Sequence, residues 1–459
     1  MLRLTGLTLA TFLAFCPDAP QPFSRALASA SAVDPSAKSA KSVDSSADVR
    51  TLIAAAHGAS PLLCSYAVHA VGNGGWGWDN APATPLPHPE RRSSRSEPLT
   101  PDDVQFLLAS LGGNGPCASE LAVRLLANDE SAAVTDGLIR TLASADTSAR
   151  MVAALGLGLS SPDRAADALI GVVNDKATGV RANAIWALGR IGDGRAVRPA
   201  TGALRDPSPM VREAAAGTLG QLDSTSSAAA LARVLASDEV AAVRRTAAWA
   251  LGQLEAKEAV SALSTALHAD KDAEVREMAA WALGNIEARS AGEALLAAAQ
   301  SDSDESVRET AVWALGNIED AGAADALGRL IAGDKSHDVR ETAAWALGQL
   351  ELQAAPKGLL DALADSDAEL RTRAAWALGE IGDEAALPAI RTALTREQDA
   401  RARKAEIRAL VHSGERPEAL QAFLKSKDPR IRETAVRGMV GDARLDPWPW
   451  PMPRPRPFP

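Results

Sequence analysis

The sequence predicts an all-α protein, an α-solenoid of antiparallel helix pairs, on three observations. An apolar residue followed by Arg recurs every 31 or 32 residues along most of the chain. The segments around these Arg residues are nearly identical, as at 243–254, 275–286, 307–318 and 339–350. Only 4% of the 459 residues are aromatic, which suits thin Ala- and Leu-packed helices. A constant period of this length indicates helix pairs that stack on their neighbours to bury their apolar faces.

The chain before the repeats divides by composition. Residues 1–32 predict a signal peptide or another apolar N-terminal segment, because Arg3 precedes an apolar run that is too short to span a bilayer. Residues 33–48 are rich in Ser, Ala and Asp and predict a disordered linker. Residues 49–103 predict N-terminal helices with a long loop at 72–100. Thr100, Pro101 and Asp103 then predict the capped start of a new helix.

The repeat array is predicted over residues 104–441. Each unit predicts a first helix that ends near a glycine such as Gly284, then a turn, then a second helix such as residues 259–267. The end units replace the usual aromatic residue by Arg408 and Arg437, as polar capping repeats would. Residues 442–459 form a Pro-rich tail, which is expected to be extended and close to polyproline II.

Composition and motifs exclude several classes of function. Lys and Arg number 48 against 58 Asp and Glu, a net charge of -10, so the chain lacks the basic surface that nucleic-acid binding needs. The six His never form H-E-x-x-H and the three Cys never form C-x-x-C. We therefore assign no catalytic, cofactor-binding or metal-binding residue. Asp270-Lys271-Asp272 resembles the opening of a calcium loop but lacks its later Gly and Glu, so helix capping is the better interpretation.

Two cysteines lie near the start of the array. If the protein is exported, a disulfide between Cys64 and Cys117 would tie the irregular N-terminal part to the repeats. The alternative is that both are small buried apolar residues.

An Asp precedes each repeat Arg by six residues. We expect it to cap the helix and the Arg to bond it across the turn, which makes both structural. The structural residues assigned in this way are Arg181, Arg212, Arg244, Arg276, Arg308, Arg340, Arg371, Asp270, Asp302 and Asp334.

The unit D-x-x-x-x-V-R-x-x-A-A-x-A-L-G-x-[IL] resembles the HEAT-like repeats named after the bilin (phycocyanobilin) lyases, over about residues 115–441. The resemblance implies a solenoid with an Asp and Arg ladder along its turns. It also implies two alternative functions: an enzyme or enzyme subunit of bilin-lyase type, or an accessory module of an envelope protease. The His-Glu pairs of the iron-dependent hydroxylase branch are missing from the sequence.

Tryptophan is the strongest functional signal. Trp281 falls about 150° from the centre of the apolar face of its helix, among polar neighbours. One interpretation is a ladder of exposed rings lining a groove, and the other is rings that cover the Ala-rich seam between adjacent helices. Six of the ten Trp lie five residues after the repeat Arg: Trp186, Trp249, Trp281, Trp313, Trp345 and Trp376.

Polar residues flank these rings at helical spacing. The acids Glu277, Glu309 and Glu341 favour a neutral or basic ligand, and the amides of Asn285 and Asn317 could bond a backbone. The sequence therefore predicts a partner-binding surface for something extended.

The favoured function is a non-enzymatic protein-interaction scaffold, exported to the periplasm or secreted, with a cytoplasmic protein as the alternative. The expected partner is a protein or peptide. Pro-rich segments, including the chain's own residues 447–459, are candidate ligands. A membrane is a partner only if the N-terminal segment is retained.

Overall fold

The computed structural model describes residues 45–57, 59, 99–113 and 115–440, and these residues contain helices and no strand. The chain divides into two compact units, Met1–Leu222 and Asp223–Pro459. Among the described residues, no helix has both the length and the apolar character needed to cross a bilayer. The predicted signal segment 1–32, most of the loop 72–100 and the tail 442–459 lie outside the described residues.

Unit 1 begins with short helices and continues as helix pairs. The capping box predicted at Thr100 is present, because its hydroxyl accepts from the Asp103 amide while the Asp103 carboxylate accepts from the Thr100 amide. The helices are α3 (Ser45–Ala56), α5 (Pro101–Ala109), α6 (Pro116–Ala127), α7 (Ala132–Thr141), α8 (Thr147–Ser160), α9 (Ala166–Val172), α10 (Thr178–Ile191), α11 (Val197–Ala203) and α12 (Pro209–Gln221).

The start of α3 corrects one predicted boundary. Residues up to 48 were expected to be a linker, whereas α3 begins at Ser45. The Ser- and Asp-rich sequence that suggests disorder also supplies residues favoured at helix starts, and the apolar residues that follow, such as Ile53, are buried. Composition alone therefore cannot distinguish a disordered linker from the start of a helix here.

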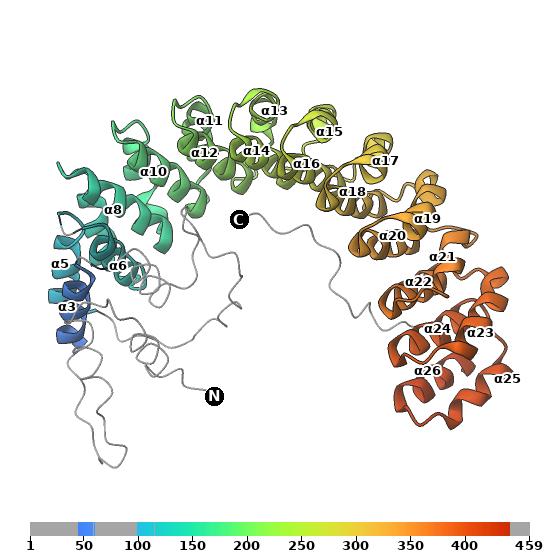
Figure 1. The fold of residues 1–459 in the computed structure, drawn as a ribbon. Coiled ribbons are helices and arrows are strands. Elements are labelled where there is room, and N and C mark those ends of the chain that lie inside the picture. Colours follow the sequence, from blue (N-terminus) through green and yellow to red (C-terminus); the bar gives the residue numbers. More distant parts are fainter. Residues whose placement is uncertain (1–44, 58, 60–98, 114, 441–459) are drawn as a thin grey trace, which may run out of the picture. The chain divides into compact units, whose positions relative to one another are not determined.

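Unit 2 consists of two rows of helices (Figure 1). The motif helices, which carry the repeat Arg, pack side by side in one row, and shorter partner helices form the other. The motif helices are α14 (Ala241–Gln253), α16 (Ala273–Asn285), α18 (Glu305–Asn317), α20 (His337–Gln349), α22 (Ala368–Ile381), α24 (Ala400–His412) and α26 (Pro429–Met439). The partner helices are α13 (Ala228–Ser237), α15 (Val260–Ala269), α17 (Gly292–Ser301), α19 (Ala324–Gly333), α21 (Lys357–Ala362), α23 (Leu387–Arg396) and α25 (Pro417–Leu420).

The ends of the motif helices follow from local sequence. Asp272 and Asp304 cap α16 and α18 by accepting hydrogen bonds from amides of the first turn. The predicted caps, Asp270 and Asp302, lie two residues earlier and instead accept from the backbone amides of Asp272 and Asp304. After α16 the chain turns sharply at Glu287, which adopts a left-handed conformation with φ of 53°. Gly382 takes the equivalent place after α22, where no Cβ opposes a positive φ.

The core lies between the two rows. Val275, Ala279 and Leu283 of α16 are fully buried, as is Leu263 of α15. Small residues let neighbouring backbones approach closely, which is why so few aromatic residues suffice.

A ladder of Arg side chains ties each repeat to the next. Arg276 donates through Nε and Nη2 to the Asp302 carboxylate at 2.7 and 2.9 Å, and through Nη1 to the Asp270 carbonyl oxygen at 2.9 Å. Within the units, the same carboxylate pairing joins Arg150 to Asp175, Arg181 to Asp206, Arg244 to Asp270, Arg308 to Asp334 and Arg371 to Glu397.

This arrangement corrects the predicted pairing. We expected each Arg to bond the Asp six residues before it, but only the backbone carbonyl of that residue accepts, as between Arg212 and Asp206 at 3.0 Å. The carboxylate of that Asp receives the Arg of the preceding repeat, 25 or 26 residues earlier. Arg340 is an exception, because its Nε donates to the Ile331 carbonyl oxygen at 2.7 Å while Nη2 alone contacts Asp365.

Candidate interaction surface

The repeated tryptophans are not an exposed ladder. Trp313, Trp345 and Trp376 are only 7%, 2% and 6% exposed. Trp249 and Trp281 of unit 2 are half-buried, and so is Trp186 of unit 1. The prediction of exposed rings is therefore wrong for the three buried ones, and the alternative, in which the rings cover the seam between adjacent helices, describes them better.

Five of these rings, all except that of Trp249, fill a notch made by a glycine of the preceding motif helix, as Trp186 does at Gly158. A Cβ atom built on Gly284 would lie 2.8 Å from Cζ3 of Trp313, closer than carbon atoms can approach. Gly252 meets Trp281 in the same way, Gly316 meets Trp345, and Gly348 meets Trp376. The repeated Leu-Gly therefore has a packing function, because only glycine leaves room for the ring of the next repeat.

The reason for the wrong expectation is the environment of the helix. A motif helix has a partner helix on one side and a further motif helix on each flank, so most of its circumference is covered. A helical wheel drawn for one isolated helix treats the positions that contact the flanking helices as exposed to solvent. The Trp side chain then lies across the flank, against the backbone of its predecessor.

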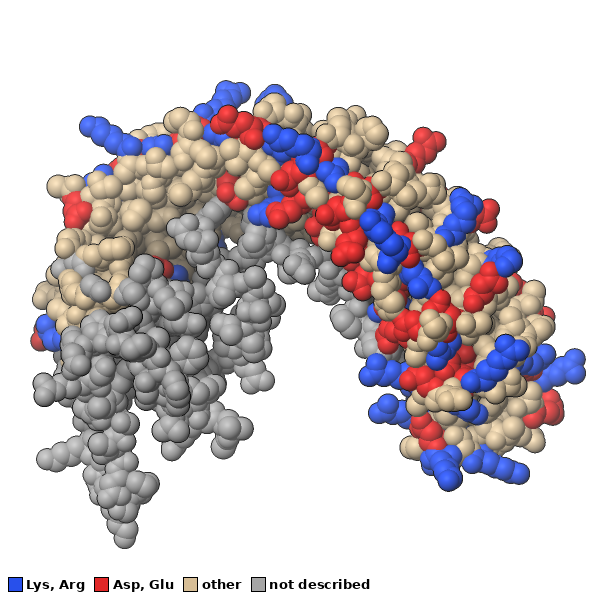
Figure 2. Space-filling view, viewed as in Figure 1, with Lys and Arg blue, Asp and Glu red and all other residues tan. Residues whose placement is uncertain are grey.

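The polar positions beside the rings form a line of acids that we call the acidic row: Glu277, Glu309 and Glu341. They occupy the same place on α16, α18 and α20, one residue after the repeat Arg. Glu277 and Glu309 are half-buried and Glu341 is buried. Figure 2 shows acidic and basic side chains gathered in a band along this part of unit 2.

Burial perturbs the acidic row. It raises the pKa of Glu309 above its ordinary value, and the negative charges of Asp338 and Glu277 act in the same direction. The Thr342 hydroxyl donates to Glu309 Oε1 at 3.4 Å, which opposes this rise in pKa. Burial also raises the pKa of Glu341, although the charge of Arg373 opposes it. Two of the three acids of the row thus have a pKa that is raised by burial.

Arginines flank the row on both sides. Arg245 occupies the equivalent position on α14 and contacts Glu274. On α22 that position holds Thr372, and the next residue, Arg373, contacts Glu341. The acidic character is therefore concentrated on α16, α18 and α20.

One group of side chains beside the row has the residue types of a metal site. Single ligand atoms of His337, Glu341 and Asp367 lie within 4.8 Å of one another. However, His337 Nδ1 lies 2.9 Å from Glu341 Oε1 and its Nε2 contacts Asp367, so both ring nitrogens already face carboxylates. Arg373 also forms an ion pair with Glu341. This cluster is best described as an ion-paired tie between α20 and α22.

The predicted amides have different surroundings. Asn285 Nδ2 donates to the carbonyl oxygen of Gly252 at 3.0 Å, and so satisfies an acceptor near the end of the preceding motif helix. His412 Nδ1 lies 3.2 Å from the Gly379 carbonyl oxygen at the equivalent place. Asn285 is nevertheless exposed and Asn317 is half-buried. Sequence reasoning missed this link because it joins residues 33 apart.

A buried acid that sequence reasoning also missed lies on α24. Glu406 is 0% exposed, and neither carboxylate oxygen has a hydrogen-bond partner among the described residues. Burial raises its pKa to about 8, helped by Glu397 and opposed by Arg371 and Arg403. The sequence did contain a sign of it, because the position of the repeat that holds Glu406 on α24 holds Ala279 on α16.

The structure describes only one of the two cysteines of the predicted disulfide. Cys117, at the start of α6, is disulfide-bonded. Cys64 lies outside the described residues, so its pairing with Cys117 stays a prediction. Trp76, Trp78, Trp448 and Trp450 also lie outside them.

These features define the class of protein: a solenoid of stacked helix pairs joined by an Arg ladder and by Trp rings in glycine notches. The family model of HEAT repeats matches residues 135–203, 171–251, 234–307, 292–368 and 356–440. The chain belongs to the HEAT-repeat family, which confirms the resemblance predicted from its motif.

Two solved structures with TM-scores of 0.57 and 0.50 agree with this chain at the level of the fold. Importin beta is 13% identical over 95% of this chain and 69% of that chain, with a TM-score of 0.57. A structure of Kap95p with RanGDP is 16% identical over 74% of this chain and 55% of that chain, with a TM-score of 0.50. The complex of CpcE and CpcF of phycocyanin lyase from Nostoc sp. PCC7120 is 26% identical over 49% of this chain and 91% of that chain, with a TM-score of 0.33. A search of curated proteins finds no match. The fold is consistent with a protein-interaction scaffold.

Proposed function

We propose that this protein is an exported, non-enzymatic scaffold that holds an extended, basic protein segment along the acidic row of unit 2. The observation that carries the proposal is the stacking of three carboxylates in one register on consecutive motif helices. Glu277 and Glu309 are only half-buried, so a ligand can reach the row. The HEAT-repeat fold of the chain and of importin beta supports a protein as the partner.

Electrostatics favours a cationic ligand over a neutral one. Burial raises the pKa of Glu309, and the charges of Asp338 and Glu277 add to the cost of keeping it ionised. A Lys or Arg side chain placed between Glu277 and Glu309 would favour their ionised form and gain charge-assisted hydrogen bonds, whereas Glu341 already faces Arg373. Binding of this kind is expected to weaken as salt increases.

The buried tryptophans change the predicted surface. Because Trp313 and Trp345 are buried, they act in this proposal as supports of the acidic row rather than as contacts. The half-buried rings of Trp249 and Trp281 remain within reach of a ligand, as does the exposed amide of Asn285.

The length of the row suits an extended segment. Packed helices lie about 9 to 10 Å apart, so the three helices α16, α18 and α20 that carry the row span on the order of 20 Å. A polyproline II segment rises about 3.1 Å per residue, so roughly six or seven residues cover that distance. Residues 447–459 alternate Pro with other residues and include Arg454 and Arg456. We propose this tail, from the same or a neighbouring molecule, as one ligand of the row.

Export rests on the N-terminal sequence and on one covalent bond. The positive start and apolar run of residues 1–32 suit a secretory signal. The disulfide at Cys117 supports an oxidising compartment such as the periplasm, since disulfides rarely persist in a reducing cytoplasm.

A peptide titration tests the proposed surface. A fluorescent peptide with the sequence of residues 447–459 is titrated with protein that ends at Asp446, and binding is followed by anisotropy. The E277Q/E309Q/E341Q variant is expected to bind at least about tenfold more weakly, a loss of about 1.4 kcal/mol. The control variant E255Q/E287Q/E319Q removes the same charge from the exposed turns that follow α14, α16 and α18 and is expected to bind like the wild type. Equal affinity in all three proteins would contradict the proposal.

A further inference from the structure

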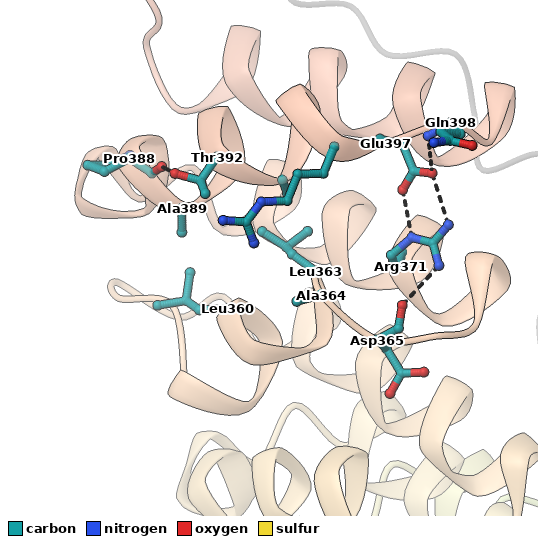
Figure 3. Close-up of a pocket in the computed structure, with 12 residues that line it drawn as sticks. Leu360, Leu363, Ala364, Asp365, Arg371, Pro388, Ala389, Thr392, Glu397 and Gln398 are labelled. Atoms are coloured by element: carbon teal, nitrogen blue, oxygen red, sulfur yellow. Dashed lines mark hydrogen bonds and ion pairs between the residues drawn. The ribbon is translucent and has the colours of Figure 1, made fainter.

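The row of partner helices in unit 2 contains a cavity between α21 and α23, on helices that do not carry the acidic row (Figure 3). Its volume is about 710 Å³, within the usual range of small-ligand sites. The cavity coincides with a short helix. Whereas α19 and α23 have ten residues each, α21 has six.

A close backbone contact lies on the other side of α21. A Cβ atom on Gly358 would overlap the backbone of Gly328, so α21 lies unusually close to α19. The loop before α21 is held by a hydrogen bond from the Ala355 amide to Asp383 at 2.9 Å. The Gly328–Gly358 contact thus brings α21 close to α19, while the hydrogen bond to Asp383 ties the preceding loop to the turn before α23.

One half of the cavity wall is apolar: six of its twelve lining residues are Leu, Ala or Pro. Leu360 and Leu363 of the α21 segment face Pro388 and Ala389 of α23 across it (Figure 3). Pockets of this composition take ligands with an apolar body, and the few polar groups at the edge fix their orientation.

The polar end of the cavity is positively charged. Arg371 is paired with Glu397 through bonds of 2.6 and 2.9 Å, and Asp365 is contacted by Arg340. Both carboxylates are therefore neutralised by their own arginines. Arg396 also lines the cavity, is exposed, and has no ion pair or hydrogen bond to any other described residue. It is the lining charge that a ligand would compensate.

We infer that the α21–α23 cavity binds a small amphipathic anion, a carboxylate with an aliphatic or aromatic body. The body lies between the apolar walls and the carboxylate faces Arg396. Arg371 and Arg396 repel a cationic head group of the same size, and Asp365 and Glu397 offer it little compensation because each already faces an arginine. This site is independent of the acidic row, because none of its lining residues lies on α16, α18 or α20 and it has the opposite charge preference.

Calorimetric titration of the full chain with octanoate tests the site, with octylammonium as the probe of opposite charge. The wild type is expected to bind octanoate and not octylammonium. R396Q and the cavity-filling variant A389F are each expected to weaken octanoate binding by at least about tenfold. R329Q is the matched control, because Arg329 is an exposed arginine on α19 that does not line the cavity.

Three outcomes would overturn the inference: no octanoate binding by the wild type, equal binding of octylammonium, or unchanged octanoate affinity in R396Q. Should A389F fail to fold, as judged by its circular dichroism, R396Q and R329Q decide the question by themselves, because both change exposed side chains.

Discussion

At the scale of single residues, the most informative contact is the one between a repeated Trp and the glycine of the preceding motif helix. Sequence alone predicts the register of these tryptophans and of the glycines. It cannot predict that they meet, because Gly284 and Trp313 are joined only when two repeats stack. A periodic Trp is therefore compatible with an exposed ladder and with a buried seam, and the burial of Trp345 to 2% exposure distinguishes the two.

Replacement of Gly284 by Ala should destabilise the protein. The new Cβ would lie 2.8 Å from Cζ3 of Trp313 and 2.9 Å from Cβ of Ala314. Overpacking of this kind costs about 1 to 3 kcal/mol, more than the roughly 1 kcal/mol that Ala gains over Gly in helix propensity. We expect a net loss of about 1 kcal/mol or more in the free energy of unfolding, measured in urea.

The control for this change is Gly333→Ala. Gly333 ends α19, and a Cβ there would meet no atom within 4 Å, so the substitution should be neutral or slightly stabilising. In a W313L background, part of the cost of G284A should disappear because the ring is gone. Equal effects of G284A and G333A would show that the glycine notch is unimportant.

At the scale of helices, the sequence predicts the elements well and their mutual bonds poorly. The period, the capping box at Thr100 and the Asp caps of the motif helices are local features, and local features can be derived from spacing. The carboxylate partner of Arg276 is not local, since Asp302 lies 26 residues away on the next repeat. The Gly328–Gly358 contact beside α21 was likewise outside the reach of sequence patterns.

The helix α24 departs from the other motif helices by holding Glu406 where they hold Ala, and this departure should appear as a pH-dependent stability. The folded-state pKa of Glu406 is raised to about 8. Below the unfolded pKa both states are protonated. As pH rises toward 8, the unfolded chain loses the proton and the folded chain keeps it, so wild-type stability falls.

The variant E406Q removes this titration. We expect its melting temperature to rise relative to that of the wild type between pH 5 and pH 8, by about 5 °C or more. Other groups, including Glu397, Arg371 and Arg403 beside the carboxyl, are common to both proteins, so the difference between the two melting curves isolates Glu406. A difference that is constant over this pH range would contradict the buried, protonated state.

At the scale of the whole molecule, the chain is a HEAT-repeat protein, and this fold is consistent with a protein-interaction scaffold. The sequence is sufficient to predict the solenoid and the acids of unit 2, because both follow from the repeat. The partner is beyond its reach, since the pKa values of Glu309 and Glu341 are raised by burial, and that of Glu309 also by Asp338 on a neighbouring repeat. The central claim is that these acids recognise a basic, extended partner.

The most direct test of that claim is the recovery of partners from a cell-envelope extract by three immobilised proteins. These are the wild type, E277Q/E309Q/E341Q and the charge-matched control E255Q/E287Q/E319Q, and bound proteins are identified and quantified by mass spectrometry. We expect the wild type and the control to retain at least one basic partner that the acidic-row variant loses. Salt should elute this partner from the wild type and the control. Equal recovery of every partner by all three proteins would contradict it.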